Sequence, residues 1–513
     1  MVSEFERQRE ENILRNKELL KELNLQSLAQ EFGESKKKIK PKSVKSKKLD
    51  KYDTKFKPDS NLPLRRSRRI AGVKIEPEMI KDEDEIADTV GLNGDQLPKI
   101  EQRITNDFKL SDLIKDENKL KNLGDKFSAA DFYNDIKDKV PVSSDLKGAR
   151  DSLDNLQLYD NFPPNKIQIV SSRITTMEFH PSNKRKILIG GDKLGELGIW
   201  TIDDDTPDDP EPSITKFQPH IKNIPRIRMR VEAPEEVITC SYDGTMRTLN
   251  LQKGASILSM DFADRWGDPT GISDFHFIDK NVGFITTLDG EGMKFDLREA
   301  PLKRSNHMWR LHDKKIGYST ICPTNSNLFA SASLDRTMRI WDLRMIQNQH
   351  WSSFEHDKSP KCIASYSSRL SVSTVDWNKS GDIVCNGYDD SIRIFNLNKN
   401  GKGIENYLNS LVKSETGEIS ENIKPDQTIV HNCKTGRWVT ILKSRWQSTP
   451  SDGVEKFVIA NMKKYLDVYS ADGTMLTHLS HDYMTSIPAA CVFHPSENWI
   501  AGGNNSGKTF LFT

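Results

Sequence analysis

A short unit recurs along the last two thirds of this 513-residue chain, and it constrains the fold more than any other feature. Its clearest copy lies within Leu328–Arg344, where a small-residue strand leads through a tight turn at Leu334–Arg336 into an alternating strand that closes on Trp341-Asp342. Weaker copies of this unit occur at Ser241–Asn250, Thr287–Asp296, Gly387–Asn396 and Asn461–Ser470. Such a unit, returning every ~40–50 residues, is typical of one blade of a β-propeller.

The position held by Trp341 in each copy gives the number of blades. Two further degraded copies end at Trp200 and Phe512, so this position is occupied in turn by Trp200, Leu249, Phe295, Trp341, Phe395, Tyr469 and Phe512. We therefore predict an all-β fold, a seven-bladed WD40 β-propeller over residues 161–513. The last strand, Lys508–Thr513, lacks an outer neighbour, and Lys166–Val170 is the segment expected to pair with it and close the ring.

Residues 1–160 have a different, highly charged composition, and we predict that they are largely disordered and partly helical. Residues 3–30 lack Gly and Pro, which favours a short helix, solvated or folded against a partner. Residues 36–74 hold sixteen Lys and Arg against three Asp and cannot bury a core. Within them Arg65, Arg66, Arg68 and Arg69 are compact enough for a nuclear-import signal or a phosphate-binding clamp, and a solvated tail is the alternative.

Composition excludes several classes of protein. The 75 basic and 74 acidic residues nearly balance, so any nucleic-acid signal is local. The six cysteines form no C-x-x-C pair and indicate reduced thiols, and we find neither a signal peptide nor an apolar run long enough to span a membrane. No acid pair, metal-ligand spacing or nucleophile constellation stands out, so we predict no enzyme, catalytic residue, metal, cofactor or small-molecule substrate.

The segment His431–Trp446 is the most suggestive candidate site. It interleaves Lys434, Arg437, Lys443 and Arg445 with Trp438, a mixture suited to gripping phosphates beside stacked bases. We predict that these five residues contact DNA. Other basic loops, which the sequence does not place on one side of the ring, are Lys184–Lys186, Arg226/Arg228/Arg230 and Lys314–Lys315.

Two blade copies end in Asp-Leu-Arg, at Asp296–Arg298 and Asp342–Arg344. An Arg two residues beyond the Trp-Asp pair resembles the W-D-x-R box of substrate receptors for cullin-type ubiquitin ligases, where the Arg pairs with acidic groups of the adaptor. We predict partner binding by Arg298, Asp342 and Arg344. The alternative is an ordinary blade end whose Arg forms an intramolecular ion pair.

The repeats, the W-D-x-R box and His431–Trp446 together resemble the WD-repeat family that contains the smaller subunit of the UV-damaged-DNA-binding complex. The fungal DNA damage-binding branch is the nearer match, through an N-terminal Glu-Arg-Gln-Arg-type helix at Glu6–Glu10 and the patch Arg65–Arg69. In that subunit a Phe-Gln-His hairpin enters the lesion. Gly436, Arg437 and Trp438 occupy the matching positions here, so the wedge is a glycine and Trp438 is its candidate substitute.

The resemblance implies a nuclear location, with the cytoplasm left open, and binding to chromatin or to replication and repair proteins. Our first hypothesis is a non-enzymatic DNA-binding propeller that holds duplex and UV-damaged DNA in the DNA damage response. The alternative is a protein-interaction scaffold or substrate receptor of a cullin-type ubiquitin ligase, for which DNA binding is incidental.

Overall fold

The computed structural model of the protein describes residues 144–206, 208–263, 268–299, 308–354, 357–398, 403–411, 419, 421–436 and 439–513. The helix predicted at 3–30, the basic segment 36–74 with its four arginines, and the pair Arg437 and Trp438 lie outside these residues. The division of the chain at residue 160 stays a prediction.

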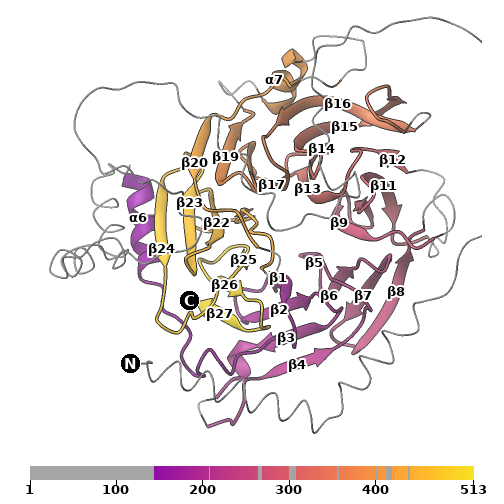
Figure 1. The fold of residues 1–513 in the computed structure, drawn as a ribbon. Helices are drawn as coiled ribbons and strands as arrows, with labels where there is room; N and C mark the ends of the chain where they lie inside the picture. The colour runs from indigo at the N-terminus through magenta and orange to yellow at the C-terminus, as the bar shows by residue number, and fades with distance from the viewer. Residues whose placement is uncertain are drawn as a thin grey trace, which may run out of the picture. The chain divides into compact units, whose positions relative to one another are not determined.

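Within the described ranges the strands form seven antiparallel sheets, each made of neighbours in chain order (Figure 1). The first three blades are β1 Ile174–Phe179, β2 Ile187–Asp192, β3 Leu197–Thr201 and β4 Ile214–Phe217; β5 Arg226–Arg230, β6 Ala233–Cys240, β7 Thr245–Asn250 and β8 Ala255–Asp261; and β9 Ile272–Phe277, β10 Val282–Thr287, β11 Glu291–Asp296 and β12 Trp309–Arg310. A short 3-10 turn, η1 Ile202–Asp204, follows β3.

The other four blades complete the set. They are β13 Ile316–Cys322, β14 Asn325–Ser333, β15 Thr337–Asn348 and β16 Lys358–Ser367; β17 Val372–Trp377, β18 Asp382–Gly387, β19 Ser391–Asn396 and β20 Gln427–Val430; β21 Arg445–Trp446, β22 Lys456–Asn461, β23 Tyr465–Ser470 and β24 Met475–Leu479; and β25 Ala490–Phe493, β26 Ile500–Gly503 and β27 Thr509–Phe512. Each first strand contacts the first strand of the next blade, and β25 contacts β1, so the ring is closed. The predicted seven-bladed propeller is confirmed.

The residues used to count the blades all lie on the third strand of their blade. Each is buried, with at most 9% of its surface exposed, as expected for apolar side chains between neighbouring sheets: Trp200, Leu249, Phe295, Trp341, Phe395, Tyr469 and Phe512. Trp341 also starts a buried chain of hydrogen bonds. Its Nε1 donates to Ser331 Oγ at 2.8 Å, Ser331 Oγ lies 2.7 Å from His312 Nε2, and His312 Nδ1 lies 2.8 Å from Asp335.

The outer edge of the last strand is covered by the chain that enters the propeller. Thr509 N donates to Ile167 O, and Gln168 bridges Lys508, as expected for Lys166–Val170. A second stretch extends the pairing, because Leu158 bridges Phe512, while Gln157 and Thr513 exchange backbone hydrogen bonds of 3.0 Å. The closure therefore uses two short stretches and holds both ends of the ring together.

Two helices lie outside the blades in the described part of the chain. The helix α6, Ser144–Asp154, packs along β24, where Leu153 is fully buried and Arg150 donates to Met475 O at 2.8 Å (Figure 1). The helix α7, Ile404–Leu411, lies in the connection between β19 and β20 and buries Leu408. The long connection that contains α7 therefore belongs to the fifth blade.

The turns between second and third strands share one backbone feature. One residue in each has φ between 55° and 95°: Gly195, Gly244, Gly290, Arg336, Asp390, Lys464 and Gly507. Glycine adopts this left-handed region freely, whereas a side chain costs ~1–2 kcal/mol there. The turn at Gly507 also explains the sequence Gly502–Thr509, which satisfies the P-loop pattern but runs into strand β27.

Candidate nucleic-acid interface

The topology assigns every loop to one of two ends of the propeller. The first strands run in the same direction around the ring, so all second-to-third turns and all connections from one blade to the next lie at one end. The first-to-second turns and third-to-fourth connections lie at the other end. We call these ends the basic face and the far face, for the charges described below.

The basic face exposes more cations than anions. Among the described residues of its connections, the exposed basic ones are Lys193, Lys222, Lys314, Arg336, Arg369, Lys434, Lys463 and Lys464. The exposed acidic ones are Asp268, Asp289 and Asp482. Other aspartates of this face are turned inward: Asp243 accepts from Ile221 N and Thr245 N, and Asp335 from Thr337 N. The turn geometry thus draws carboxylates inward and leaves amines in solvent.

The far face has the opposite balance. Its described connections expose the acidic residues Asp203, Asp204, Asp208, Asp209, Glu211, Glu232, Asp279, Glu299, Glu405, Glu421, Asp426, Asp452 and Asp472. The exposed basic residues there are Lys184, Arg185, Lys253, Lys280, Arg298, Lys379 and Lys424. Arg185 forms an ion pair of 2.8 Å with Asp204. The loop Lys184–Lys186 therefore lies at the end opposite Lys314–Lys315 and cannot extend the same positive surface.

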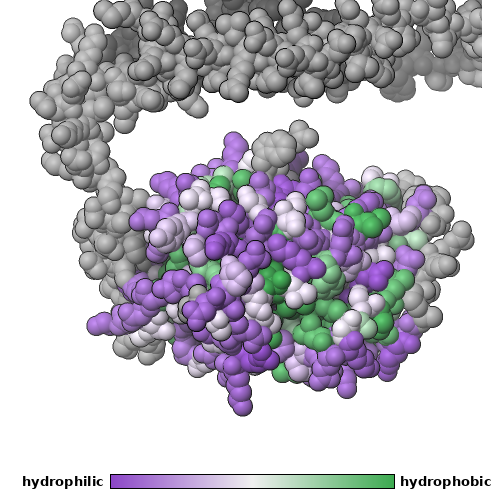
Figure 2. Space-filling view, turned by 90° about the horizontal axis from the view of Figure 1, so that it is seen from below, coloured by the Kyte–Doolittle hydropathy of each residue, from purple (hydrophilic) through white to green (hydrophobic). Residues whose placement is uncertain are grey.

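The rim between the two faces has a third character. Figure 2 views the ring from the side of the outer strands β4 and β8 and shows a largely hydrophilic surface with one hydrophobic area. On β8 the side chains of Ile257 and Leu258 are exposed, at 62% and 39%. The rim thus exposes apolar side chains at β8.

A cluster of charged side chains lies on the axis of the ring. We call it the axial cluster, and it comprises Glu178, Arg226, Arg228, Asp274, His276, Tyr318, Asp376 and Arg445. Its contacts join blades that are not neighbours: Arg226 of the second blade stacks 4.1 Å from the ring centroid of Tyr318 in the fourth, and Arg445 of the sixth pairs with Glu178 of the first at 3.0 Å. Only side chains that point to the axis can do this.

The buried arginine at position 226 is matched by a carboxylate. Arg226 Nε donates to Asp274 at 2.7 Å, and the two side chains are each 1% exposed. Burial alone would raise the pKa of Asp274, but the Arg226 guanidinium holds that pKa well below its usual range. The pair is therefore ionised and structural.

His276 joins this cluster in its neutral form. Burial, followed by the charge of Arg228, lowers the pKa of His276 to about 3. Its Nε2 lies 2.7 Å from Ser319 O and its Nδ1 lies 2.9 Å from Arg228 Nη2, so the Nε2–H tautomer donates to the carbonyl and Nδ1 accepts from the arginine. The axial cluster thus combines satisfied ion pairs with one neutral histidine.

The structure separates the predicted DNA-contacting residues of His431–Trp446. Lys434 is exposed on the basic face, and Lys443 is half-buried, with Nζ 5.1 Å from the ring centroid of Tyr318. Arg445 points to the axis, where it donates to Met177 O and Glu178 at 3.0 Å each. Trp446 is buried and its Nε1 donates to Asp376 O, consistent with core packing. Of the predicted DNA-contacting residues that the structure describes, Lys434 is thus exposed, Lys443 is half-buried and Arg445 is held in an ion pair.

Sequence reasoning named Arg226, Arg228 and Arg230 as a basic loop, and this interpretation was wrong. They occupy alternate positions along β5, where Arg226 and Arg228 face the axis. Arg230, the last residue of the strand, pairs with Glu236. The alternation in Arg-Ile-Arg-Met-Arg could have indicated a strand with its arginines on one face, because alternate residues of a strand share a face. Their partners Asp274, His276 and Tyr318 were missed, since only the closed ring brings first strands together.

Of the W-D-x-R arginines, Arg344 lies within the long third strand β15, and Arg298 follows the third strand β11. Arg344 donates to both carboxylate oxygens of Asp342, and its Nη2 is 2.8 Å from Asp342 Oδ2. Arg298 pairs with Asp296 in the same manner. Both arginine side chains remain exposed, at 51% and 68%. The intramolecular ion pair left open by the sequence is present in both blades.

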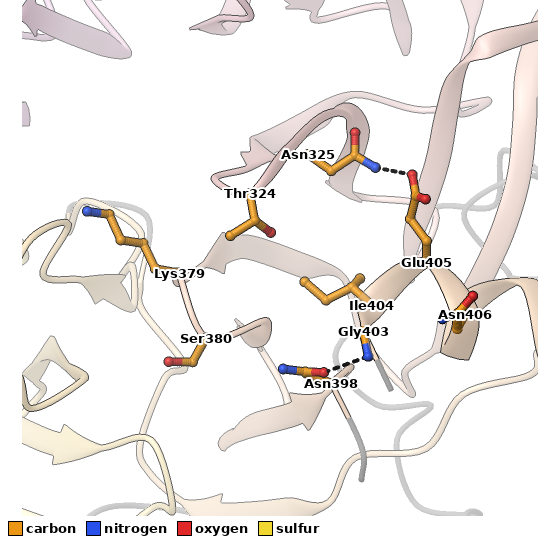
Figure 3. Close-up of a pocket in the computed structure, with 9 residues that line it drawn as sticks. All are labelled: Thr324, Asn325, Lys379, Ser380, Asn398, Gly403, Ile404, Glu405 and Asn406. Atoms are coloured by element: carbon orange, nitrogen blue, oxygen red, sulfur yellow. Dashed lines mark hydrogen bonds between the residues drawn. The ribbon is translucent and has the colours of Figure 1, made fainter. Parts of the chain in front are cut away.

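A polar hollow of about 540 Å³ lies beside Arg344 on the far face (Figure 3). It is lined by Thr324, Asn325, Lys379, Ser380, Asn398, Gly403, Ile404, Glu405 and Asn406. Asn325 donates to Glu405, which also lies 3.6 Å from Arg344. The lining holds one lysine, one glutamate and the hydroxyl groups of Thr324 and Ser380, and its glutamate is already engaged by Asn325 and Arg344.

The described residues contain no group of three or more His, Cys, Asp or Glu side chains that could hold a metal ion. None of the helices described is both long enough and apolar enough to cross a membrane.

Comparison with known proteins identifies the family. The WD domain, G-beta repeat family matches residues 305–342, which include β12 to β14 and part of β15, and residues 360–396, which run from β16 to β19. DNA damage-binding protein CMR1 of Scheffersomyces stipitis is 44% identical over all of this chain and 99% of its own length. The chain belongs to this family. The CMR1 proteins of Candida albicans and Kluyveromyces lactis are 38% and 37% identical over the whole chain and 100% and 99% of their own lengths. The resemblance to fungal DNA damage-binding WD-repeat proteins is thus confirmed.

Proposed function

We propose that the protein is a non-enzymatic nuclear protein that binds duplex DNA, including UV-damaged duplex, on the basic face of its propeller. The observation that carries this proposal is the charge asymmetry between the two loop ends. Among the described residues, eight exposed lysines and arginines oppose three exposed acids on the basic face, and the far face has the reverse excess. Phosphate neutralisation by such residues supplies most of the affinity of proteins for duplex DNA. The relatives are named for DNA damage binding, which supports the same ligand.

The proposal assigns distinct roles to the predicted residues. Lys434 contacts phosphates, and Arg437 and Trp438 of the same sequence segment are proposed as further DNA contacts. Lys443 lies where this connection returns to the axis. Arg65, Arg66, Arg68 and Arg69 add an electrostatic tether that recognises phosphates without regard to sequence. Chromatin is the natural setting for such a protein.

The proposal is tested by reversing charge on one face at a time. Lys222→Glu with Lys463→Glu changes the basic face, and Lys184→Glu with Lys379→Glu makes the same change of charge on the far face. We expect the first variant to bind irradiated and intact duplexes at least ~10-fold more weakly and to flatten the salt dependence, because two phosphate contacts are lost. The far-face variant should bind like the wild-type protein. Fluorescence anisotropy at several salt concentrations measures both, and equal loss in the two variants would refute the assignment of the face.

A second function is supported by the far face. Arg298 and Arg344 expose their guanidinium groups at the end opposite the proposed DNA surface, and Arg344 borders the polar hollow of Figure 3. A cullin-ligase adaptor with acidic groups could dock there while DNA occupies the other end. We expect Arg298→Ala with Arg344→Ala to abolish adaptor capture in a pull-down and to leave DNA affinity unchanged. Capture that survives both substitutions would remove this function.

A further inference from the structure

The connection from the sixth to the seventh blade carries two exposed aromatic side chains on the basic face. Between β24 and β25, His481 and Tyr483 are both exposed, Tyr483 at 63%. Their rings are stacked, with centroids 5.0 Å apart and an angle of 28° between the planes. Among the residues that the structure describes, no other aromatic ring of this face is exposed. One side of the Tyr483 ring is thus covered by His481, and most of the remainder lies in solvent.

The exposure of His481 is unusual among the histidines of this face. Three other connections between blades carry a histidine soon after the outer strand, and all three are buried: His220, His312 and His431. The ring of His312 shows what holds such a histidine inside, because its nitrogens lie 2.7 Å from Ser331 Oγ and 2.8 Å from Asp335. Both partners belong to the blade that follows the connection.

The seventh blade has different residues at the positions that hold His312 in the fourth. Counted back from the shared third-strand position, Gly502 and Ser506 stand where the fourth blade has Ser331 and Asp335. Glycine has no side chain to hydrogen-bond with an imidazole, and serine has no carboxylate. The sequence of the seventh blade therefore explains why His481 lies in solvent and stacks on Tyr483.

Hydrogen bonds hold the two rings in place. His481 Nδ1 accepts from Tyr483 N at 3.2 Å, and His481 O accepts from Met484 N at 2.9 Å. The Met484 side chain, which follows Tyr483 directly, is buried at 4% exposure and anchors the connection to the core. A surface that is ordered before binding loses little conformational entropy when a ligand stacks on it.

The charges around the stack are mainly positive. The pairing of Leu466 with Leu479 brings the start of this connection beside the turn between β22 and β23, which carries the exposed Lys463 and Lys464. The connection itself also exposes one acid, Asp482. An aromatic ring beside two ammonium groups matches a nucleotide that has left its stack, because the base stacks on the ring while phosphates meet the lysines.

We propose that Tyr483 stacks on a nucleobase that has left the helical stack of duplex DNA held on the basic face. The bases of an intact duplex are stacked on one another, whereas a damaged, mismatched or bulged position costs less to open. Tyr483 thus gives the protein a preference for duplexes with a displaced base, which phosphate contacts alone do not provide. This inference rests on the proposed function, since the basic face must first hold the duplex.

Binding of the full-length protein to two duplexes tests the proposal. One duplex is fully paired, and the other has the same sequence with a single bulged base. Tyr483→Ser removes the ring and Tyr483→Phe keeps it. Tyr242→Ser is the matched control, because Tyr242 lies in a turn of the same face but its ring is already covered by Lys315, with Nζ 4.6 Å from the centroid. Fluorescence anisotropy at several salt concentrations measures the affinities.

We expect the wild-type protein, Tyr483→Phe and Tyr242→Ser to prefer the bulged duplex by at least ~5-fold, and Tyr483→Ser to bind both duplexes equally, as one base–aromatic stack is lost. The slope of log affinity against log salt should be the same in Tyr483→Ser and the wild-type protein, because no phosphate contact changes. A preference that survives in Tyr483→Ser, or that is lost equally in Tyr242→Ser, would overturn the proposal.

A photochemical cross-link locates the contact directly. Irradiation joins an iodouracil at the bulged position to an aromatic ring in contact with it, and peptide mass spectrometry should place the link at Tyr483. A link at Trp438 or within residues 36–74 would contradict the assignment.

The wild-type affinities separate the two proposals. If the wild-type protein binds both duplexes equally, the stacking role of Tyr483 is wrong and the proposed function stands. If it binds neither duplex, both are wrong. A melting temperature of Tyr483→Ser equal to that of the wild-type protein shows that the lost preference is not a loss of folding.

Discussion

The two ends of the propeller are built by the same repeat, and yet they differ in charge. At the basic face the aspartates of the second-to-third turns bond to backbone amides and buried side chains, as Asp335 does to Thr337 N and His312. The exposed charges left there are mainly lysines. At the far face the acids lie in longer connections and stay in solvent, while the arginines Arg298 and Arg344 pair with their own aspartates. The comparison shows that the blade turns engage aspartate carboxylates in hydrogen bonds at the basic face, so these carboxylates are not left in solvent there.

The axis between the two ends provides the largest expected effect. Asp274→Ala leaves Arg226 buried without a counter-ion, and we expect it to lower the free energy of unfolding by about 3–5 kcal/mol. Chemical denaturation measures the loss. A much smaller loss of unfolding free energy would mean that the axial arginines do not need their carboxylate partners. The distinction between structural cations at the axis and ligand-binding cations on the basic face would then fail.

The neutral histidine of the axial cluster gives the next effect. His276 has a folded-state pKa of about 3, below its unfolded value of ~6.5, so the unfolded state binds the additional proton. The stability that it contributes is fully present above about pH 6.5 and falls as the pH drops toward 3. We expect His276→Gln to reduce this slope in denaturation curves recorded between pH 7 and pH 4. An unchanged slope would show that other groups carry the acid sensitivity.

A single lysine sharpens the comparison of the two faces. Lys434→Ala on the basic face should weaken DNA binding several-fold and reduce the slope of log affinity against log salt by about one. Lys424→Ala makes the same change in an exposed far-face connection and should alter neither quantity. Titrations at several salt concentrations between ~50 and ~200 mM measure the change in slope. A drop for Lys424→Ala alone would reverse the assignment of the faces.

The smallest effect concerns the turns of the basic face. Arg336 has φ of 76° at a position where four other blades carry glycine. We expect Arg336→Gly to raise the free energy of unfolding by up to about 1 kcal/mol, because glycine adopts this conformation without strain. Thermal denaturation measures the gain. A loss of stability would show that the Arg336 side chain makes a contact worth more than the strain.

Much of the fold followed from one local pattern. The apolar position of each repeat, from Trp200 to Phe512, lies buried on a third strand because alternation and burial are set within a blade. The second stretch of ring closure, at Leu158, gave no such pattern, because its partner Phe512 is more than 350 residues away in the chain. The candidate site was predicted only in part. DNA contact by Lys434, which is exposed, and by Lys443, which is half-buried, stays a prediction, whereas Arg445 points to the axis and pairs with Glu178.

The sequence by itself determined that seven blades form, because each repeat carries its own strands, turns and buried side chains. Only the tertiary structure decided which charges are exposed together. Lys184 and Lys314 look alike in the chain, and the closure of the ring sends them to opposite ends. In the sequence Arg226 has the appearance of a surface cation, but in the closed ring its side chain is buried against Asp274 and Tyr318 of other blades. Strand pattern is a property of neighbouring residues, whereas the contacts of Arg226 with Tyr318 and of Arg445 with Glu178 join blades that meet only at the axis.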